Sequence, residues 1–125
     1  MKMYIAGEWV DRDSKVDVTN PYDGSLIDTV PSASLDDLEA AIASAARGAE
    51  IMRNMSGYQR FEILRRAADI MTERQDELGR TISTEEGKII GEGLAEADRA
   101  KQTIELSGEE AKRLYGETIP LDGAS

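Results

Sequence analysis

Seven carboxylates in the second half of the chain are the residues with the clearest potential for chemistry. Two such groups, one protonated and one ionised, can act together as a general acid and a general base. No spacing singles out one pair, and acidic residues more often cover the solvated face of a helix. Both interpretations stay open for this set, which comprises Glu85, Glu86, Glu92, Glu96, Asp98, Glu109 and Glu110.

Other kinds of catalytic chemistry are excluded by residue type. The 125 residues include neither histidine nor cysteine. Serine–histidine triads, cysteine nucleophiles and zinc sites of the usual composition all need one of these side chains. The sequence therefore predicts none of these sites.

Two glycine-containing stretches match nucleotide-binding loops only in part. Gly91-Glu92-Gly93 has the first half of a dinucleotide fingerprint, but it lacks the third glycine and follows a helical pattern rather than a strand. Gly87-Lys88 lacks the upstream glycine and the following serine or threonine of a phosphate loop. Judged from these residues alone, the chain is not a self-sufficient enzyme.

The charge of the chain limits its partners and its location. The net charge is −10, which argues against nucleic acid and anionic membranes, because both attract basic patches. No apolar run approaches the roughly 20 residues of a membrane span. The first ten residues lack the apolar region of a signal peptide, so a cytoplasmic location is expected.

The elements that would position any site are mostly helical. The stretch 56–87 has apolar residues at helical spacing, a capping-box start at Ser56 and Gln59, and a soft joint near Arg74 and Gln75. A second helix is expected to start after Ser34, with Asp37 at the capping-box position, and a third helical region to run from about Ile90 to Tyr115. The apolar faces of these helices need a partner surface.

The first 31 residues predict short strands. Residues 3–10 fit a hairpin with a turn at Ala6-Gly7. Residues 16–19 and 25–30 alternate as strands around a turn at 20–24, and Pro31 ends the second. The chain is therefore expected to be mostly α-helical with short N-terminal β-strands.

The order of several short motifs resembles the opening of the aldehyde dehydrogenase superfamily. Each motif is weak alone, but together they cover nearly the whole chain in the family's order and spacing. They are Tyr4-Ile5-Ala6-Gly7-Glu8-Trp9-Val10, Asn20-Pro21-Tyr22-Asp23-Gly24, the helix with Arg60 and Ile63 to Ala68, Glu86-Gly87-Lys88, Glu96-Ala97-Asp98-Arg99-Ala100 and Tyr115-Gly116-Glu117-Thr118-Ile119-Pro120.

The resemblance implies an NAD(P)-dependent oxidoreductase that converts an aldehyde to a carboxylic acid, within an α/β fold that has a Rossmann-type dinucleotide-binding domain. In that family a cysteine thiolate attacks the carbonyl, hydride passes to NAD or NADP, and a glutamate-activated water releases the acyl group. Those residues lie further along the family's chain than this sequence reaches. The 125-residue chain alone is therefore expected to be inactive and to bind no cofactor, and the full-length enzyme to be a homo-oligomer.

Within that family the chain would be the N-terminal segment of the NAD(P)-binding domain. Residues 1–31 would form a strand arm, residues 34–116 three helical regions and residues 117–125 an extended tail. Some members of the family bind a monovalent cation, and the positions that match its ligands are the Val18 and Thr19 carbonyls and Glu96. A solvated Glu96 is the alternative. Where many members have proline after Gly-Lys, this chain has Ile89.

A second hypothesis is a stand-alone acidic helical binding module, or a truncated pseudo-enzyme, whose helices pack on each other. The two hypotheses differ in surplus apolar surface. A segment of a larger fold is expected to expose more contiguous apolar area than the few hundred Å² that monomers usually tolerate.

Overall fold

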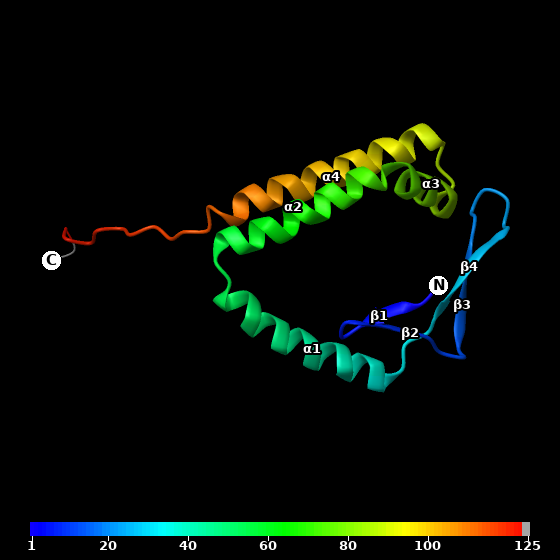
Figure 1. Ribbon diagram of the computed structural model, residues 1–125, viewed down its shortest axis with the longest axis horizontal. Helices are drawn as coiled ribbons and strands as arrows, with labels where there is room; N and C mark the ends of the chain where they lie inside the picture. Colours follow the sequence, from blue (N-terminus) through cyan, green and yellow to red (C-terminus); the bar gives the residue numbers. More distant parts are fainter. Residues whose placement is uncertain (124–125) are drawn as a thin grey trace.

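The computed structural model describes residues 1–123, which form four strands followed by four helices. The strands are β1 Met3–Ile5, β2 Glu8–Val10, β3 Lys15–Thr19 and β4 Leu26–Pro31, and the helices are α1 Leu35–Asn54, α2 Gly57–Glu73, α3 Gln75–Glu86 and α4 Ile90–Ala111. Helix α1 and the pair of α2 and α4 diverge from the turn that joins α1 to α2 (Figure 1).

The four strands form two separate antiparallel pairs, as the sequence predicts. Strands β1 and β2 pair around a turn in which Ala6 and Gly7 both have positive φ, at 53° and 94°. Such a turn matches the right-handed twist of a short hairpin. Strands β3 and β4 pair with an irregularity between Val18 and Thr19. In the turn between them, the Asn20 amide donates a hydrogen bond to the Ser25 carbonyl at 2.9 Å.

Helix α1 begins with the capping box that Ser34 and Asp37 predict. The Ser34 side chain accepts a hydrogen bond from the Asp37 amide, and the Asp37 carboxylate accepts one from the Ser34 amide. At the other end of α1, Arg60 of α2 donates through Nη1 to the carbonyls of Met52 and Met55. Side chains thus satisfy backbone groups at both ends of α1.

The joint expected near Arg74 and Gln75, within residues 56–87, is present in the structure. Helix α2 ends and α3 begins at Arg74, whose φ of −108° departs from helical geometry. The Arg74 guanidinium donates to both carboxylate oxygens of Glu77 across this break. The prediction of one helical stretch with a joint is therefore confirmed as two helices in sequence.

Helix α4 ends at Ala111, earlier than the predicted Tyr115. The Lys112 and Arg113 amides bond to the carbonyls three residues before them, so the last turn tightens. Beyond it the side chains of Leu114 and Tyr115 are exposed, and no packing holds the backbone helical. The chain then leaves the bundle as an extended segment, as predicted; residues 124 and 125 of the predicted tail lie outside the described part (Figure 1).

The core of the helical bundle, which we define as α2, α3 and α4, is made of small residues. Helix α4 packs against both α2 and α3. A Cβ added to Gly93 would lie 2.3 Å from the Gly79 carbonyl oxygen, so the backbones of α3 and α4 touch there. The buried small residues of the bundle are Ala68, Gly79, Gly93, Ala97, Gly108 and Ala111.

The remaining elements, the four strands and α1, form the N-terminal arm. Within the arm, α1 contacts β1, and its contacts with the bundle are few. The only buried residue of α1 is the polar Asp37. Among the described residues, no helix is long and apolar enough to cross a membrane.

Candidate functional site

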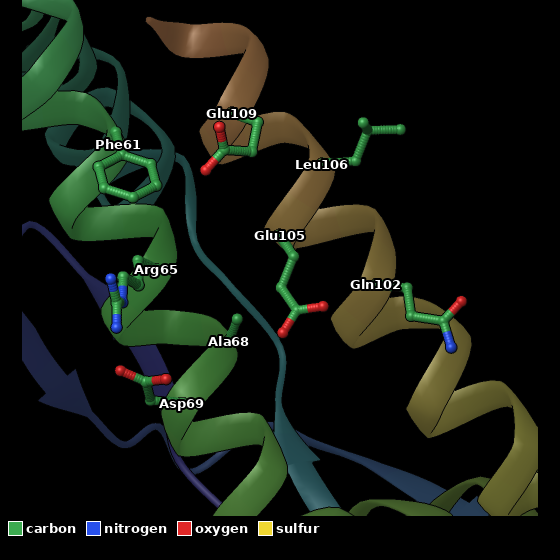
Figure 2. Close-up of a pocket in the computed structure, with 8 residues that line it drawn as sticks. All are labelled: Phe61, Arg65, Ala68, Asp69, Gln102, Glu105, Leu106 and Glu109. Carbon is green, nitrogen blue, oxygen red and sulfur yellow. The ribbon is translucent and has the colours of Figure 1, made fainter.

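A groove of about 530 Å³ runs between α2 and α4 (Figure 2). Arg65 and Asp69 line it from α2, and Glu105 and Glu109 from α4. Figure 2 shows the Glu105 carboxylate extending toward α2, whereas Leu106 points away from it. The titratable groups here are carboxylates and one guanidinium, so the available chemistry is proton transfer or binding of a charged group.

The geometry of Glu109 disfavours a role as a general acid. Lys112 Nζ lies 2.8 Å from Glu109 Oε2 and 3.8 Å from the centre of the Phe61 ring. The hydrogen bond from Lys112 holds the pKa of Glu109 below its usual range. Because Glu109 is therefore ionised at neutral pH, the end of the groove is an ion pair and a cation–π contact.

The other carboxylates of the predicted set are surface residues. Asp98 pairs with Lys101 at 3.6 Å, and Glu110 with Arg113 at 3.0 Å, both one helical turn apart. Glu85 and Glu92 are exposed, without a salt bridge in the described part of the chain. These placements support the solvated helix face over a paired acid and base.

The partial dinucleotide fingerprint has a packing role. Gly91 and Gly93 lie in the first turn of α4. Gly93 is buried against the Gly79 carbonyl of α3, while nothing lies within 4 Å of a Cβ added to Gly91. Only Gly93 is required by its surroundings, and that requirement is close helix contact.

Lys88, in the turn between α3 and α4, is the centre of a charged cluster. Its ammonium lies 2.5 Å from Glu86 Oε2 and 2.7 Å from Glu96 Oε1. The hydrogen bonds that Lys88 donates to Glu86 and then to Glu96 raise the pKa of Lys88 well above its usual range, and the same bond from Lys88 lowers the pKa of Glu96. Arg99 and Glu92 line the same hollow, of about 470 Å³.

The predicted cation ligands Val18, Thr19 and Glu96 lie on two sides of Lys88. Val18 and Thr19 end β3, at the irregularity in its pairing with β4. The next residue, Asn20, lines a hollow together with Lys88, and Lys88 also lines the hollow that contains Glu96. Lys88 is thus the residue that connects the strand end with Glu96.

The family resemblance implies a monovalent cation at these residues, and the contacts of Glu96 show whether its carboxylate is free to bind one. The donor oxygens have the right chemistry, since carbonyls and a carboxylate suit hard cations. However, Glu96 already accepts a hydrogen bond from the Lys88 ammonium. A metal ion at Glu96 would have to displace this ammonium or sit beside it, so the site as it stands does not fit a cation.

The comparisons with known proteins place the chain in one family. The aldehyde dehydrogenase family profile matches residues 9–125. The chain belongs to the aldehyde dehydrogenase family. It is 41% identical over 119 residues to the glutarate-semialdehyde dehydrogenase of Pseudomonas putida, and 40% identical over 118 residues to the NADP⁺-dependent succinate-semialdehyde dehydrogenase of Escherichia coli.

The likeness extends over the chain but over only part of each relative. These two alignments cover 94% and 93% of the chain and 25% and 24% of the relatives. The crystal structure of an aldehyde dehydrogenase from Brucella melitensis biovar abortus 2308 superposes with a TM-score of 0.91 at 35% identity, covering 97% of the chain and 26% of that structure. The chain thus spans about the N-terminal quarter of its family relatives, and it has the mostly helical fold, with short N-terminal strands, expected of that segment of the family.

Sequence reasoning missed two polar contacts that hold the arm together. Arg12 donates to Asp37 through Nε at 3.1 Å and Nη2 at 2.5 Å, although 25 residues separate them. The capping-box pattern revealed Asp37 but gave no sign of its partner. Arg60, in the family motif of α2, likewise gave no sign that it caps the end of α1.

Proposed function

We propose that this chain forms the N-terminal segment of an NAD(P)-dependent aldehyde dehydrogenase, which oxidises an aldehyde to a carboxylic acid. Family membership supports the activity, and the E. coli relative is named for NADP⁺. A solved betaine aldehyde dehydrogenase from Staphylococcus aureus, 29% identical to the chain, is in complex with NAD⁺. The proposal covers both dinucleotides.

The exposed apolar face of α1 is the observation that carries this proposal. Helix α1 is amphipathic, yet the apolar stripe predicted to be covered lies in solvent. A helix of an α/β protein buries such a stripe against the sheet. Five large apolar side chains of α1 are exposed, namely Leu35 at 80%, Leu38 at 51%, Ile42 at 54%, Ile51 at 64% and Met52 at 45%.

A second apolar surface extends this face onto the bundle. A hollow of about 390 Å³ lies where the end of α1 meets α2 and α4. Met52, Ile63 and Leu114 line it, and all three are exposed. Together, α1 and this hollow are suited to cover part of a dinucleotide-binding domain supplied by further residues of the fold.

In this proposal the segment is a scaffold and supplies no reacting group. The cysteine thiolate of the family's chemistry has no counterpart among the 125 residues. Its carboxylates are paired or solvated, as shown above. Turnover would therefore require residues from the rest of a dehydrogenase fold, and a homo-oligomeric, cytoplasmic enzyme is part of the proposal.

A chimeric enzyme tests the proposal. Residues 1–125 would replace the matching N-terminal segment of the E. coli succinate-semialdehyde dehydrogenase, and NADPH formation would be measured with succinate semialdehyde. We expect turnover by the chimera and none by the 125-residue chain alone. A folded chimera that binds NADP⁺ but shows no turnover would count against the proposed role, as would turnover by the chain alone.

The alternative of a stand-alone binding module predicts different surface behaviour, and the self-contained bundle is the observation in its favour. A hydrophobic dye would be titrated against the chain and against the chimera. We expect strong dye binding by the chain and weak binding by the chimera, because the face of α1 becomes covered. Weak binding by the chain together with one sharp melting transition would favour the module.

A further inference from the structure

We propose that the ammonium of Lys88 acts as a built-in cation at Glu96, so that this chain has no need of a monovalent metal ion there. The inference rests on the geometry of the α3–α4 turn and not on the proposed dehydrogenase activity. It assigns Lys88 the role of the positive charge at Glu96, one of the three residues that the family resemblance implies as ligands of a metal ion.

The backbone holds Lys88 in place from two sides. The Ser83 hydroxyl donates to the Lys88 carbonyl at 2.6 Å, which ties the turn to α3. Gly87 ends α3 in the left-handed conformation, with φ of 67°. A Cβ added to Gly87 would lie 3.0 Å from Pro21 Cγ, so the β3–β4 turn packs directly on this glycine. The backbone of Lys88 is thus held between α3 and the β3–β4 turn.

The side chain of Lys88 then reaches between two carboxylates. Its ammonium has three donors, and two of them are directed to Glu86 and Glu96. The distance of 2.7 Å to Glu96 is that of a charge-assisted hydrogen bond, and Glu86 forms a salt bridge with the same ammonium at 2.5 Å. A lysine ammonium is a compact point charge, which is also how a monovalent ion acts on a carboxylate.

Glu96 already has two positive groups of this chain beside it. Lys88 and Arg99 both face Glu96 and both stabilise its ionised form. The negative groups at the cluster are Glu86, Glu92 and Glu96 itself. A free ion would have to compete for Glu96 with Lys88, which its own backbone holds within hydrogen-bond distance.

Thermal melting of the chain in different chloride salts tests this assignment. Wild-type chain and Lys88→Met would be melted in KCl, NaCl and choline chloride at equal ionic strength. We expect equal wild-type melting temperatures in all three salts. We expect Lys88→Met to melt at a lower temperature in choline chloride and to recover part of the loss in KCl or NaCl, because a small ion can then occupy the vacated place.

Two variants check that the response belongs to Glu96. Lys101→Met removes a lysine of α4 that pairs with Asp98, and it should show no difference among the salts. The double variant Lys88→Met/Glu96→Gln should lose the recovery in KCl and NaCl. A recovery that persists without the Glu96 charge would overturn the assignment, and so would the absence of any recovery in Lys88→Met.

A measurement on the wild type keeps the proposal testable if Lys88→Met does not fold. Sodium NMR line broadening would be followed on the wild-type chain, with KCl and then choline chloride as competitors. We expect no saturable broadening that potassium removes. Saturable, potassium-sensitive sodium binding that Glu96→Gln abolishes would overturn the proposal, whatever the outcome of the chimera experiment.

Discussion

Helix α1 of the N-terminal arm is similar in length to α2 and α4 of the bundle, yet the two regions bury their surfaces in different ways. In the bundle, α4 lies against α2 and α3 through buried alanines and glycines, so both sides of each contact come from this chain. In the arm, α1 has one buried residue, the charged Asp37, and its large apolar side chains face solvent. The helix contacts inside the bundle are therefore complete within this chain. The exposed apolar face of α1 is one half of an interface whose other half this chain does not supply.

This difference shows where an amphipathic pattern suffices and where it does not. Both regions have the apolar spacing that predicts a helix. Only the bundle also has small residues at matching places on two helices, such as Gly79 and Gly93, which let backbones approach. The stability of the bundle is therefore expected to be intrinsic to the chain, and that of α1 to depend on what covers it.

The largest effect is expected from a charge inside the bundle. Leu64 of α2 lies against Gly108 of α4, whose added Cβ would be 3.4 Å from Leu64 Cβ. Leu64→Asp removes apolar contact and places a carboxylate there, which should cost about 2–5 kcal/mol or more. Urea unfolding followed by circular dichroism measures this loss. Its neighbour Ile63, 52% exposed, is the control: an equal loss in Ile63→Asp would contradict the stated packing.

Two glycine substitutions should change the stabilities of the two regions in opposite directions. In Gly93→Ala, the new methyl group meets the Gly79 carbonyl and should destabilise the bundle by about 1–3 kcal/mol. In Gly48→Ala, nothing lies within 4 Å, and α1 should gain up to about 1 kcal/mol from better helix propensity. Hydrogen exchange resolved by segment measures both effects. A stabilised bundle in Gly93→Ala would show that α3 and α4 are not in backbone contact.

The two capping boxes allow the same chemical change in each region. Ser34→Ala and Ser56→Ala each remove a side-chain acceptor at a helix start, which costs about 1 kcal/mol. In Ser56→Ala this loss should appear as a lower urea midpoint of the whole bundle. In Ser34→Ala it should appear as faster amide exchange in α1 alone. If Ser34→Ala lowered the bundle midpoint equally, the arm and the bundle would unfold as one unit.

The effect of acid is expected to be confined to the arm. The Arg12 guanidinium, followed by the Ser34 amide, lowers the pKa of Asp37 from 3.8 to about 2. Since the folded pKa is the lower one, this contact stabilises the fold above about pH 4, and that contribution is lost as the pH falls toward 2. Amide exchange in the first turn of α1 should rise over this range in the wild type. Asp37→Asn, which cannot titrate, should show no such rise.

The sequence predicted the elements better than their partners. Both strand pairs, both capping boxes and the joint at Arg74 follow from local patterns, because turns and caps depend on neighbouring residues. The end of α4 was placed late because Leu114 continues the apolar spacing but finds nothing to pack against. Arg12 with Asp37 could not be predicted, since no local pattern joins residues that far apart.

At the candidate site, too, the sequence predicted the residue but not its contact partner. The residue types leave no thiol or imidazole among the 125 residues, and Glu96 was selected by the family motif. Its contact with Lys88 depends on the left-handed turn at Gly87 and on packing against Pro21. The cation set of Val18, Thr19 and Glu96 stays a prediction of the sequence, and the salt series above decides between the metal ion and Lys88.

The most direct test of the incomplete interface is Leu38→Asp, measured in the isolated chain and in the chimera. Leu38 is half exposed on α1, so the substitution should change the stability of the chain by no more than about 0.5 kcal/mol. In the chimera, the same carboxylate would be buried and should abolish turnover of succinate semialdehyde or the folded yield. Arg47→Asp, on the opposite face of α1, should leave the chimera active. Full activity of the Leu38→Asp chimera would contradict the account.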